Sequence, residues 1–208
     1  RAGDVVLALA SSGLHSNGYS LVRHIIAGAG IAYGDRAVDL GTNGASWGES
    51  LLEPTRLYTS PLLRLIDGID GGLHALSHVT GGGIAANLAR VLPLGTWVDV
   101  DRSTWAPPPV FQVLAEIGKL DITATEGTWN LGIGFLAIVS AETATAATAA
   151  LEAEGIATWQ VGTVHDTALP TDGGAFEQGA KGVDGGAVRL VGAYKNSAAQ
   201  GGTTQISD

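Results

Sequence analysis

The hydrophobic positions of this chain fall into short blocks separated by glycine and polar residues. Short apolar runs between such breaks predict buried strands, and apolar residues three and four apart predict amphipathic helices. Strands are expected at 4–10, 73–79, 96–100, 131–140, 157–164 and 187–191. Helices are expected at 19–27, directly after Ser46, from 60 to about 66, and at 84–92, 110–117 and 142–154.

These elements alternate irregularly, with pairs of helices between strands. That order predicts one α+β domain with a mixed β-sheet packed with helices, rather than a strict βαβ series. We expect the domain to span residues 1–195, including a polar, glycine-rich excursion at 167–186 that has no assigned role. Residues 196–208 lack a periodic apolar pattern and are expected to form a mobile tail.

Local sequence signals predict where several helices begin. Ser16 or Asn17 is expected to cap the first helix, because a serine or asparagine side chain can accept a hydrogen bond from the first backbone N–H groups. Ser46 and Glu49 have the spacing of a capping box. Ser60 precedes a proline and is expected to cap the third helix.

Composition narrows the possible functions. The net charge is −9 and charged residues make up only 15% of the chain, so a basic nucleic-acid footprint and a polybasic membrane patch are both missing. No apolar run approaches the roughly 18 residues of a membrane span. The chain has no cysteine, which excludes thiolate metal sites and a cysteine nucleophile. Glycine is abundant, at 31 of 208 residues, and is expected in turns and backbone-lined sites.

The first candidate site is the segment Thr80, Gly81, Gly82 and Gly83, which lies between a predicted strand and a predicted helix. Glycines allow backbone N–H groups to approach a ligand, and the start of a helix favours an anion. A phosphate would suit this place. The same residues also form an ordinary flexible turn, so both interpretations stay open.

The second candidate is the loop after the first strand, where Ser11, Ser12, Gly13, His15, Ser16 and Asn17 could bind a polar substrate. They could equally be turn formers and a helix cap. His15 is the only titratable group in the two loops, which makes it the candidate for orienting the substrate or transferring a proton.

Asn130 opens a glycine-containing strand and could contact a ligand or form a tight packing joint. His74 and His78 lie on a predicted strand, where a spacing of four does not bring two ligands together. No metal ligands are therefore assigned.

Several segments resemble a known family when they are read in order. They include SSGLHSNGYSLVR (11–23), LLEPTRLY (51–58), HVTGGGIAANLARVLP (78–93), STWAPPPVFQVLAEIG (103–118), WNLGIGFLAIV (129–139) and WQVGTV (159–164). Together they closely resemble the C-terminal half of aminoimidazole ribonucleotide synthetases, also called phosphoribosylformylglycinamidine cyclo-ligases, over about residues 3–166.

The resemblance implies a three-layer αβα-like C-terminal domain on the substrate side of a purine-biosynthetic enzyme. That enzyme uses ATP and magnesium to convert formylglycinamidine ribonucleotide to aminoimidazole ribonucleotide, ADP and phosphate. It is a cytoplasmic homodimer. Most ATP and metal ligands belong to an N-terminal domain that this sequence does not contain, so this chain alone is expected to be inactive.

The resemblance agrees with the two candidate loops, because the phosphate of this substrate needs an anion site such as residues 81–83 and its formylglycinamidine end needs hydrogen-bond partners such as residues 11–17. Two other functions stay open. The chain could be a non-catalytic binding module for a phosphorylated nucleotide precursor, or a domain of another ATP-using member of the same superfamily. The loop SSGLHSNGYSLVR argues against the latter.

Overall fold

The computed structural model describes residues 1–38, 40–180 and 185–195. The strands are β1 (Val5–Ala10), β2 (Leu73–His78), β3 (Trp97–Asp101), β4 (Ile133–Val139), β5 (Thr158–His165), β6 (Glu177–Gln178) and β7 (Ala187–Val191). The α-helices are α1 (Tyr19–Gly28), α2 (Trp47–Leu51), α3 (Thr59–Gly68), α4 (Gly83–Ala89), α5 (Pro109–Gly118) and α6 (Ala144–Ala153). In this part of the chain the seven strands form one sheet in the order β2-β4-β1-β5-β3-β7-β6.

The sheet is mixed, as the sequence predicts. β1 pairs antiparallel with β4 and β5, and β2 pairs antiparallel with the other side of β4. β1 and β2 therefore run in the same direction on either side of β4. β3 pairs antiparallel with β5 and parallel with β7. The carboxyl ends of β1 and β2 consequently lie at the same edge of the sheet as the beginning of β4.

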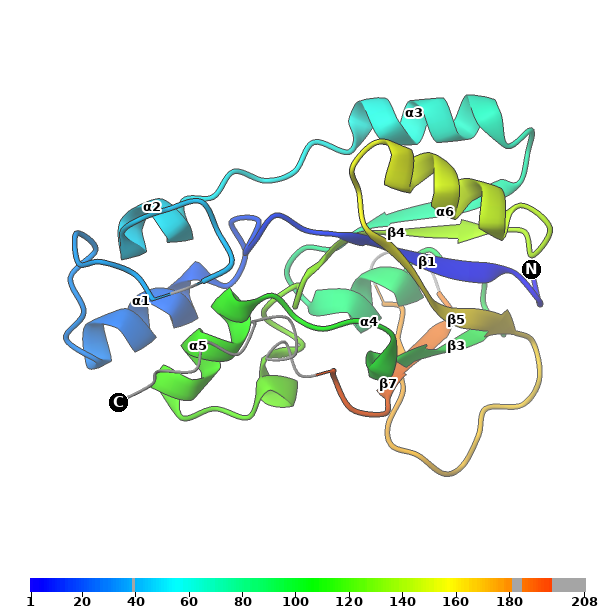
Figure 1. The fold of residues 1–208 in the computed structure, drawn as a ribbon. Helices are drawn as coiled ribbons and strands as arrows, with labels where there is room; N and C mark the ends of the chain where they lie inside the picture. The colour runs from blue at the N-terminus through cyan, green and yellow to red at the C-terminus, as the bar shows by residue number, and fades with distance from the viewer. Residues whose placement is uncertain (39, 181–184, 196–208) are drawn as a thin grey trace, which may run out of the picture.

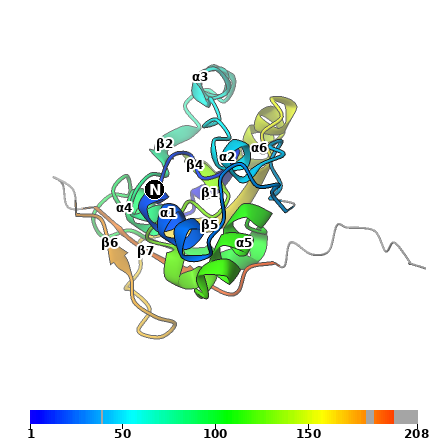
Figure 2. The same ribbon diagram turned by 90° about the vertical axis from the view of Figure 1, so that its left-hand side faces the viewer.

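The two faces of the sheet are covered by different helices. Val5, Leu7 and Leu9 of β1 pack in one apolar cluster with α3 and α6, whereas Val6 and Ala8 pack in another with α4. This alternation is the period of two that a strand buried on both faces requires. Figures 1 and 2 show α3 and α6 on one side of the sheet and α4 on the other, which confirms the three-layer arrangement.

A third cluster lies beyond one end of the sheet, where α1, α2 and α5 pack together (Figure 1, left). Phe111 of α5 and Trp129 are both fully buried in it, with their ring centroids 6.0 Å apart. Residues 11–18 and 129–132 connect this helical group to the sheet. The candidate site therefore lies where two separately packed parts of the domain join.

The predicted strands and helices are confirmed, and the bounds of β7 match the expected 187–191. The capping box is present, since Ser46 Oγ accepts the Glu49 N–H at 3.3 Å and Glu49 Oε2 accepts the Ser46 N–H at 3.0 Å. No helix in the described part of the chain is long and apolar enough to cross a membrane.

Two predicted caps are wrong. Gly18 is the N-cap of α1 and has a φ of 70°, so neither Ser16 nor Asn17 takes that position. The helix expected from Ser60 has Tyr58 as its N-cap. The expected tail at 196–208 lies outside the described residues, as do residues 181–184 of the excursion.

The layer formed by α3 gives a direct test of this packing. Leu65 is 2% exposed and belongs to the core, whereas Leu63 on the same helix is 56% exposed. We expect Leu65→Ala to lower the free energy of unfolding by about 2–5 kcal/mol, because it removes buried methyl groups and leaves a cavity. Leu63→Ala is the control and should change it by less than about 0.5 kcal/mol. Urea unfolding followed by circular dichroism measures both, and equal losses would contradict the packing.

Candidate functional site

Three segments singled out in the sequence meet at one edge of the sheet. Residues 11–18 follow β1, residues 79–82 follow β2, and residues 130–132 precede β4. Hydrogen bonds continue the pairing past the strand ends, from the Ser11 N–H to the Gly132 carbonyl at 2.8 Å and from the Val79 N–H to the Gly134 carbonyl at 3.0 Å. The two candidate loops are thereby held on either side of the first residues of β4.

Asn130 organises the first loop from inside the protein. It is 1% exposed. Its Nδ2 donates to the Gly13 carbonyl at 2.8 Å, and its Oδ1 accepts from Ser11 Oγ at 3.2 Å and from the Gly132 N–H at 2.9 Å. A buried amide with these partners fixes the loop backbone. The structure therefore places Asn130 behind the loop surface, and Ser11 with it.

His15 joins the loop to the segment that leads into α3. It is 5% exposed, and its Nε2 accepts backbone N–H groups from Ser12 at 2.9 Å and Arg56 at 3.3 Å. Because these donors cannot accept, Nε2 carries the lone pair and the proton of the neutral ring is on Nδ1. Nδ1 is buried and has no partner within the described part of the chain.

The surroundings of His15 keep it uncharged. Burial, followed by the charges of His78 and Arg56, lowers the pKa of His15 from its ordinary 6.5 to about 4. The imidazole is therefore neutral at physiological pH. With its lone pair directed at backbone N–H groups, it is better placed to position the loop than to accept a proton from a substrate.

The loop backbone is locally strained. His15 and Ser16 have φ values of 53° and 59°, in the left-handed region that residues with a Cβ seldom occupy. Asn17 supports this turn, since its Nδ2 donates to the His15 carbonyl at 2.9 Å. The turn leaves Ser16 exposed and Asn17 half-buried. These two side chains are the ones the loop presents outward, whereas the Ser12 hydroxyl donates to the Pro54 carbonyl at 2.5 Å and lies 3.0 Å from His15 Nε2.

Aromatic rings connect the two loops, and sequence reasoning did not assign them to the site. Tyr58 donates to the Ala10 carbonyl at 2.7 Å, and its ring lies 6.0 Å from that of His15. Phe135 lies 5.2 Å from Tyr58 and stacks on His78 at 5.3 Å. Burial raises the pKa of Tyr58. The segment LLEPTRLY could have pointed to Tyr58, because the resemblance includes it.

The glycines at 81–83 serve different purposes. The Gly82 N–H donates to the Gly127 carbonyl and the Gly83 N–H donates to the Thr80 carbonyl, both at 3.1 Å. Gly82 has a φ of 99°, and a Cβ on Gly83 would lie 1.6 Å from the Glu126 carbonyl oxygen. Gly82 and Gly83 are thus required by the backbone itself. A Cβ on Gly81 would meet open space, so Gly81 is the glycine of this loop that faces outward.

Asn87 of α4 holds this second loop in place. It is 4% exposed, and its Nδ2 donates to the Gly83 carbonyl at 2.7 Å and to the Thr80 carbonyl at 3.2 Å. Its Oδ1 lies 3.3 Å from Thr80 Oγ1 and accepts from Arg90 Nη1 at 2.9 Å. Each candidate loop is therefore fixed by one buried asparagine.

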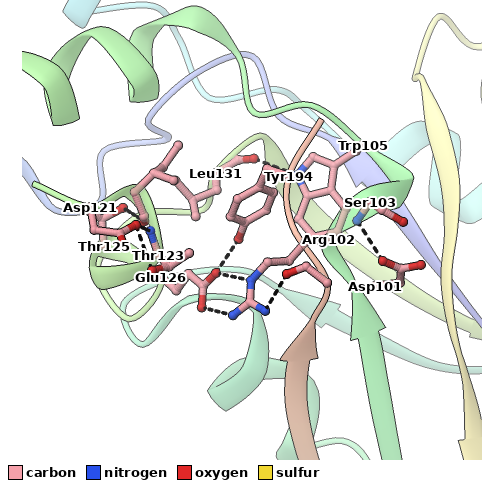
Figure 3. Close-up of polar contacts among 12 residues, drawn as sticks. Asp101, Arg102, Ser103, Trp105, Asp121, Thr123, Thr125, Glu126, Leu131 and Tyr194 are labelled. Atoms are coloured by element: carbon pink, nitrogen blue, oxygen red, sulfur yellow. Dashed lines mark hydrogen bonds and ion pairs between the residues drawn. The ribbon is translucent and has the colours of Figure 1, made fainter. Parts of the chain in front are cut away.

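An ion pair stabilises the backbone against which the second loop packs. Arg102 binds Glu126 in a two-pronged pair, with Nε–Oε1 at 2.6 Å and Nη2–Oε2 at 2.8 Å (Figure 3). Tyr194 donates to Glu126 Oε1 at 2.7 Å, and Arg102 lies 5.8 Å from the centre of its ring. Such pairs fix geometry as well as contributing energy. This pair positions Glu126 and Gly127 beside Gly82 and Gly83.

The fold and the site define the class of protein. The chain belongs to the AIR synthase related protein family, whose C-terminal domain model matches residues 1–171. Its curated relatives are phosphoribosylformylglycinamidine cyclo-ligases, which confirms the resemblance seen in the sequence.

The putative phosphoribosylformylglycinamidine cyclo-ligase of Streptomyces fradiae is 50% identical over 167 residues, which are 80% of this chain and 89% of that protein. The cyclo-ligase of Xanthomonas euvesicatoria pv. vesicatoria is 42% identical over 79% of this chain and 47% of its own length. That of Rippkaea orientalis is 43% identical over 78% of this chain and 46% of its own length. The chain thus spans about half the length of the latter two.

Solved structures share the fold at low sequence identity. Thiamine-monophosphate kinase from Stenotrophomonas maltophilia K279a matches with a TM-score of 0.53 and 17% identity, over 94% of this chain and 52% of its own. The hydrogenase maturation protein HypE of E. coli matches with a TM-score of 0.51 and 21% identity, over 93% of this chain and 48% of its own.

The depressed pKa of His15 predicts a specific loss of stability in acid. As the pH falls from 6.5 to 4, the unfolded chain binds a proton at His15 before the folded chain does. The stabilisation is therefore complete above pH 6.5 and is lost towards pH 4, by up to about 3 kcal/mol. His15→Gln, which does not titrate, should lack this part of the pH dependence in urea unfolding at pH 7 and pH 4.5.

The matched control is His24→Gln, on the exposed face of α1. This variant should keep the wild-type dependence on pH. If His15→Gln and the wild type lost the same free energy between the two pH values, the buried neutral state of His15 would be contradicted.

Proposed function

We propose that this chain is the substrate-side, C-terminal domain of an ATP-dependent cyclo-ligase of de novo purine biosynthesis. The reaction converts formylglycinamidine ribonucleotide and ATP to aminoimidazole ribonucleotide, ADP and phosphate. The observation that carries the proposal is the meeting of loops 11–18 and 80–83 at one sheet edge, in a chain that is 50% identical to a putative cyclo-ligase over 167 residues. The reaction class is that of these relatives, which are cyclo-ligases.

The two loops suit the two ends of this substrate. The outward face of Thr80 and Gly81 has room for a phosphate, since nothing lies within 4 Å of a Cβ built on Gly81. Ser16 and Asn17 offer a hydroxyl and an amide group for the formylglycinamidine end. The Ser12 hydroxyl, which the sequence also suggested, already donates to the Pro54 carbonyl. In this arrangement Ser11, Gly13, His15 and Asn130 shape the loop, whereas Gly82 and Gly83 shape the phosphate side.

The contribution of these residues to ring closure is positioning. ATP supplies the phosphoryl group that activates the formyl amide oxygen, and the amidine nitrogen then attacks the activated carbon. Holding both ends of the substrate keeps that nitrogen near the carbon, which removes much of the entropic cost of the step. The neutral His15 keeps Ser12 and Arg56 in register without adding a charge beside the substrate.

Magnesium does not fit the residues that the structure describes. The described part of the chain holds no group of three or more histidine or acidic residues that could bind a metal ion. Mg²⁺ prefers carboxylate oxygens together with substrate phosphates. We therefore place the residues that bind magnesium and ATP on an N-terminal domain. The proposal includes that domain and a cytoplasmic homodimer, as the resemblance implies.

Binding of the substrate phosphate by this loop can be tested with a substitution at Gly81. Gly81→Ala adds one methyl group to the outward face of the loop and has no backbone conflict. We expect it to weaken binding of formylglycinamidine ribonucleotide about tenfold, or about 1.4 kcal/mol, measured by calorimetry. Gly34→Ala is the control, because its added methyl group also meets open space. Unchanged affinity in Gly81→Ala would contradict the placement of the substrate phosphate at this loop.

A second test concerns catalysis. The 208-residue chain alone should show no ATP-dependent ring closure, because one side of the reaction site is missing. Adding the separately produced N-terminal half of the Xanthomonas cyclo-ligase should restore measurable formation of aminoimidazole ribonucleotide together with ADP. Robust turnover by the chain alone would contradict the division of roles. Substrate binding without any activity in the mixture would favour a non-catalytic binding module.

A further inference from the structure

A pocket of about 620 Å³ lies on the far side of the second loop, between α4, the end of β7 and residues 173–177. The family model ends at residue 171, so one wall of this pocket comes from beyond the matched domain. That wall is part of the glycine-rich excursion for which the sequence offered no role. A volume of this size is typical of pockets that bind small molecules.

One side of the pocket is formed by Arg189 of β7. Its side chain is only 7% exposed and binds Asp99 on the neighbouring strand, with Nε–Oδ1 at 2.7 Å and Nη2–Oδ2 at 3.0 Å. Its Nη1 donates to the Asp172 carbonyl. Its guanidinium lies 4.6 Å from the centre of the Phe176 ring. Arg189 thus attaches the excursion to the sheet and lines the space between them.

Arg102 lines the same pocket and is 15% exposed. A guanidinium has five N–H donors. Arg102 uses three of them on Glu126 and the Gly192 carbonyl, and Arg189 uses three on Asp99 and Asp172, within the described residues. Two donors on each remain for a ligand.

The other features of the lining favour a compact anion. Gly82, Ala85 and Ala86 line the α4 side and occupy little space. Glu126 is paired with Arg102 and Asp99 with Arg189, so the two arginines would act on a ligand through their remaining N–H groups rather than through an excess of positive charge. Glu177, the other acid of the lining, is exposed, and its charge is screened by water.

The edge of β7 adds backbone groups to the pocket. Among the residues that the structure describes, β6 pairs with Ala187 and Val188 of β7, whereas the pocket also borders Arg189 and Leu190. Beyond the short pairing with β6, the outer edge of β7 therefore faces this space. An edge of this kind offers backbone N–H and carbonyl groups to whatever occupies it.

We propose that this pocket is a second ligand site, separate from the loops assigned to the cyclo-ligase substrate, and that it binds a small phosphate monoester. The planar fork of a guanidinium matches the oxygens of a phosphate, and two arginines can donate to one phosphate together. The 620 Å³ volume leaves room for an attached sugar-sized group. Residues 173–177 form the wall that closes the site.

The test is a titration of the ¹⁵N-labelled 208-residue chain with ribose 5-phosphate, followed by amide NMR shifts. We expect the Gly173 and Gly174 amides to shift with ribose 5-phosphate and to stay in place with ribose. Absence of these shifts, or shifts confined to the Gly81 amide, would overturn the second site.

Two substitutions of Gly127 distinguish the effect of an added charge from the effect of an added side chain of the same shape. Gly127 lines the pocket, and a Cβ added to it meets open space. Gly127→Asp introduces a carboxylate and should weaken ribose 5-phosphate binding at least about tenfold, whereas the isosteric Gly127→Asn should change it less than about threefold. Equal weakening by the two variants would show that the site does not recognise an anion. Gly81→Ala should leave the Gly173 and Gly174 shifts unchanged, which keeps this test independent of the proposed cyclo-ligase function.

Discussion

The position of β4 between β1 and β2 is the constraint on which the site depends. Phe135 is the residue where it is most visible, since it pairs with Leu9 of β1 on one side and with His78 of β2 on the other. Antiparallel pairing on both sides forces the two flanking strands to end at the same edge. Loops that are about seventy residues apart in the sequence are therefore adjacent in space. No side chain in either loop has to provide that adjacency, which leaves the loops free to specialise.

Close packing of the backbone explains why glycine is required at this edge. A Cβ on Gly134 would lie 2.0 Å from the Tyr58 hydroxyl and 2.6 Å from His15 Cε1, so any larger residue would displace both rings. The same reasoning applies to Gly83 beside the Glu126 carbonyl. At such positions the close packing of the framework is enough to explain the glycine. Gly81, where a Cβ would meet open space, is not explained by such packing and stays a candidate for direct contact with a ligand.

The sequence predicted the elements well because periodicity reports burial, and β1 and β7 are buried in the way that their apolar runs indicate. The residues that cap the helices were harder to predict. The left-handed turn at His15 and Ser16 moves Ser16 and Asn17 away from the start of α1, and a single residue's preference does not reveal such a turn. Hydrogen bonds between residues far apart in the chain could not be predicted either, as with the bond from Ser11 Oγ to Asn130 Oδ1. The role of His15 depends on the Arg56 backbone, which no local pattern contains.

The two proposed sites share one piece of backbone, and this has a thermodynamic consequence. Glu126 is fixed by Arg102, and the neighbouring Gly127 carbonyl accepts the Gly82 N–H of the substrate loop. Removing either partner of a half-buried ion pair leaves the other charge uncompensated, so the backbone at 126–127 has little freedom to move independently of Arg102. A ligand that bound Arg102 would act on the same backbone from the other side. If this ligand favoured one arrangement of Gly127, it would change the affinity of the loop for the substrate by some factor. Linkage then requires the bound substrate to change the affinity for this ligand by the same factor.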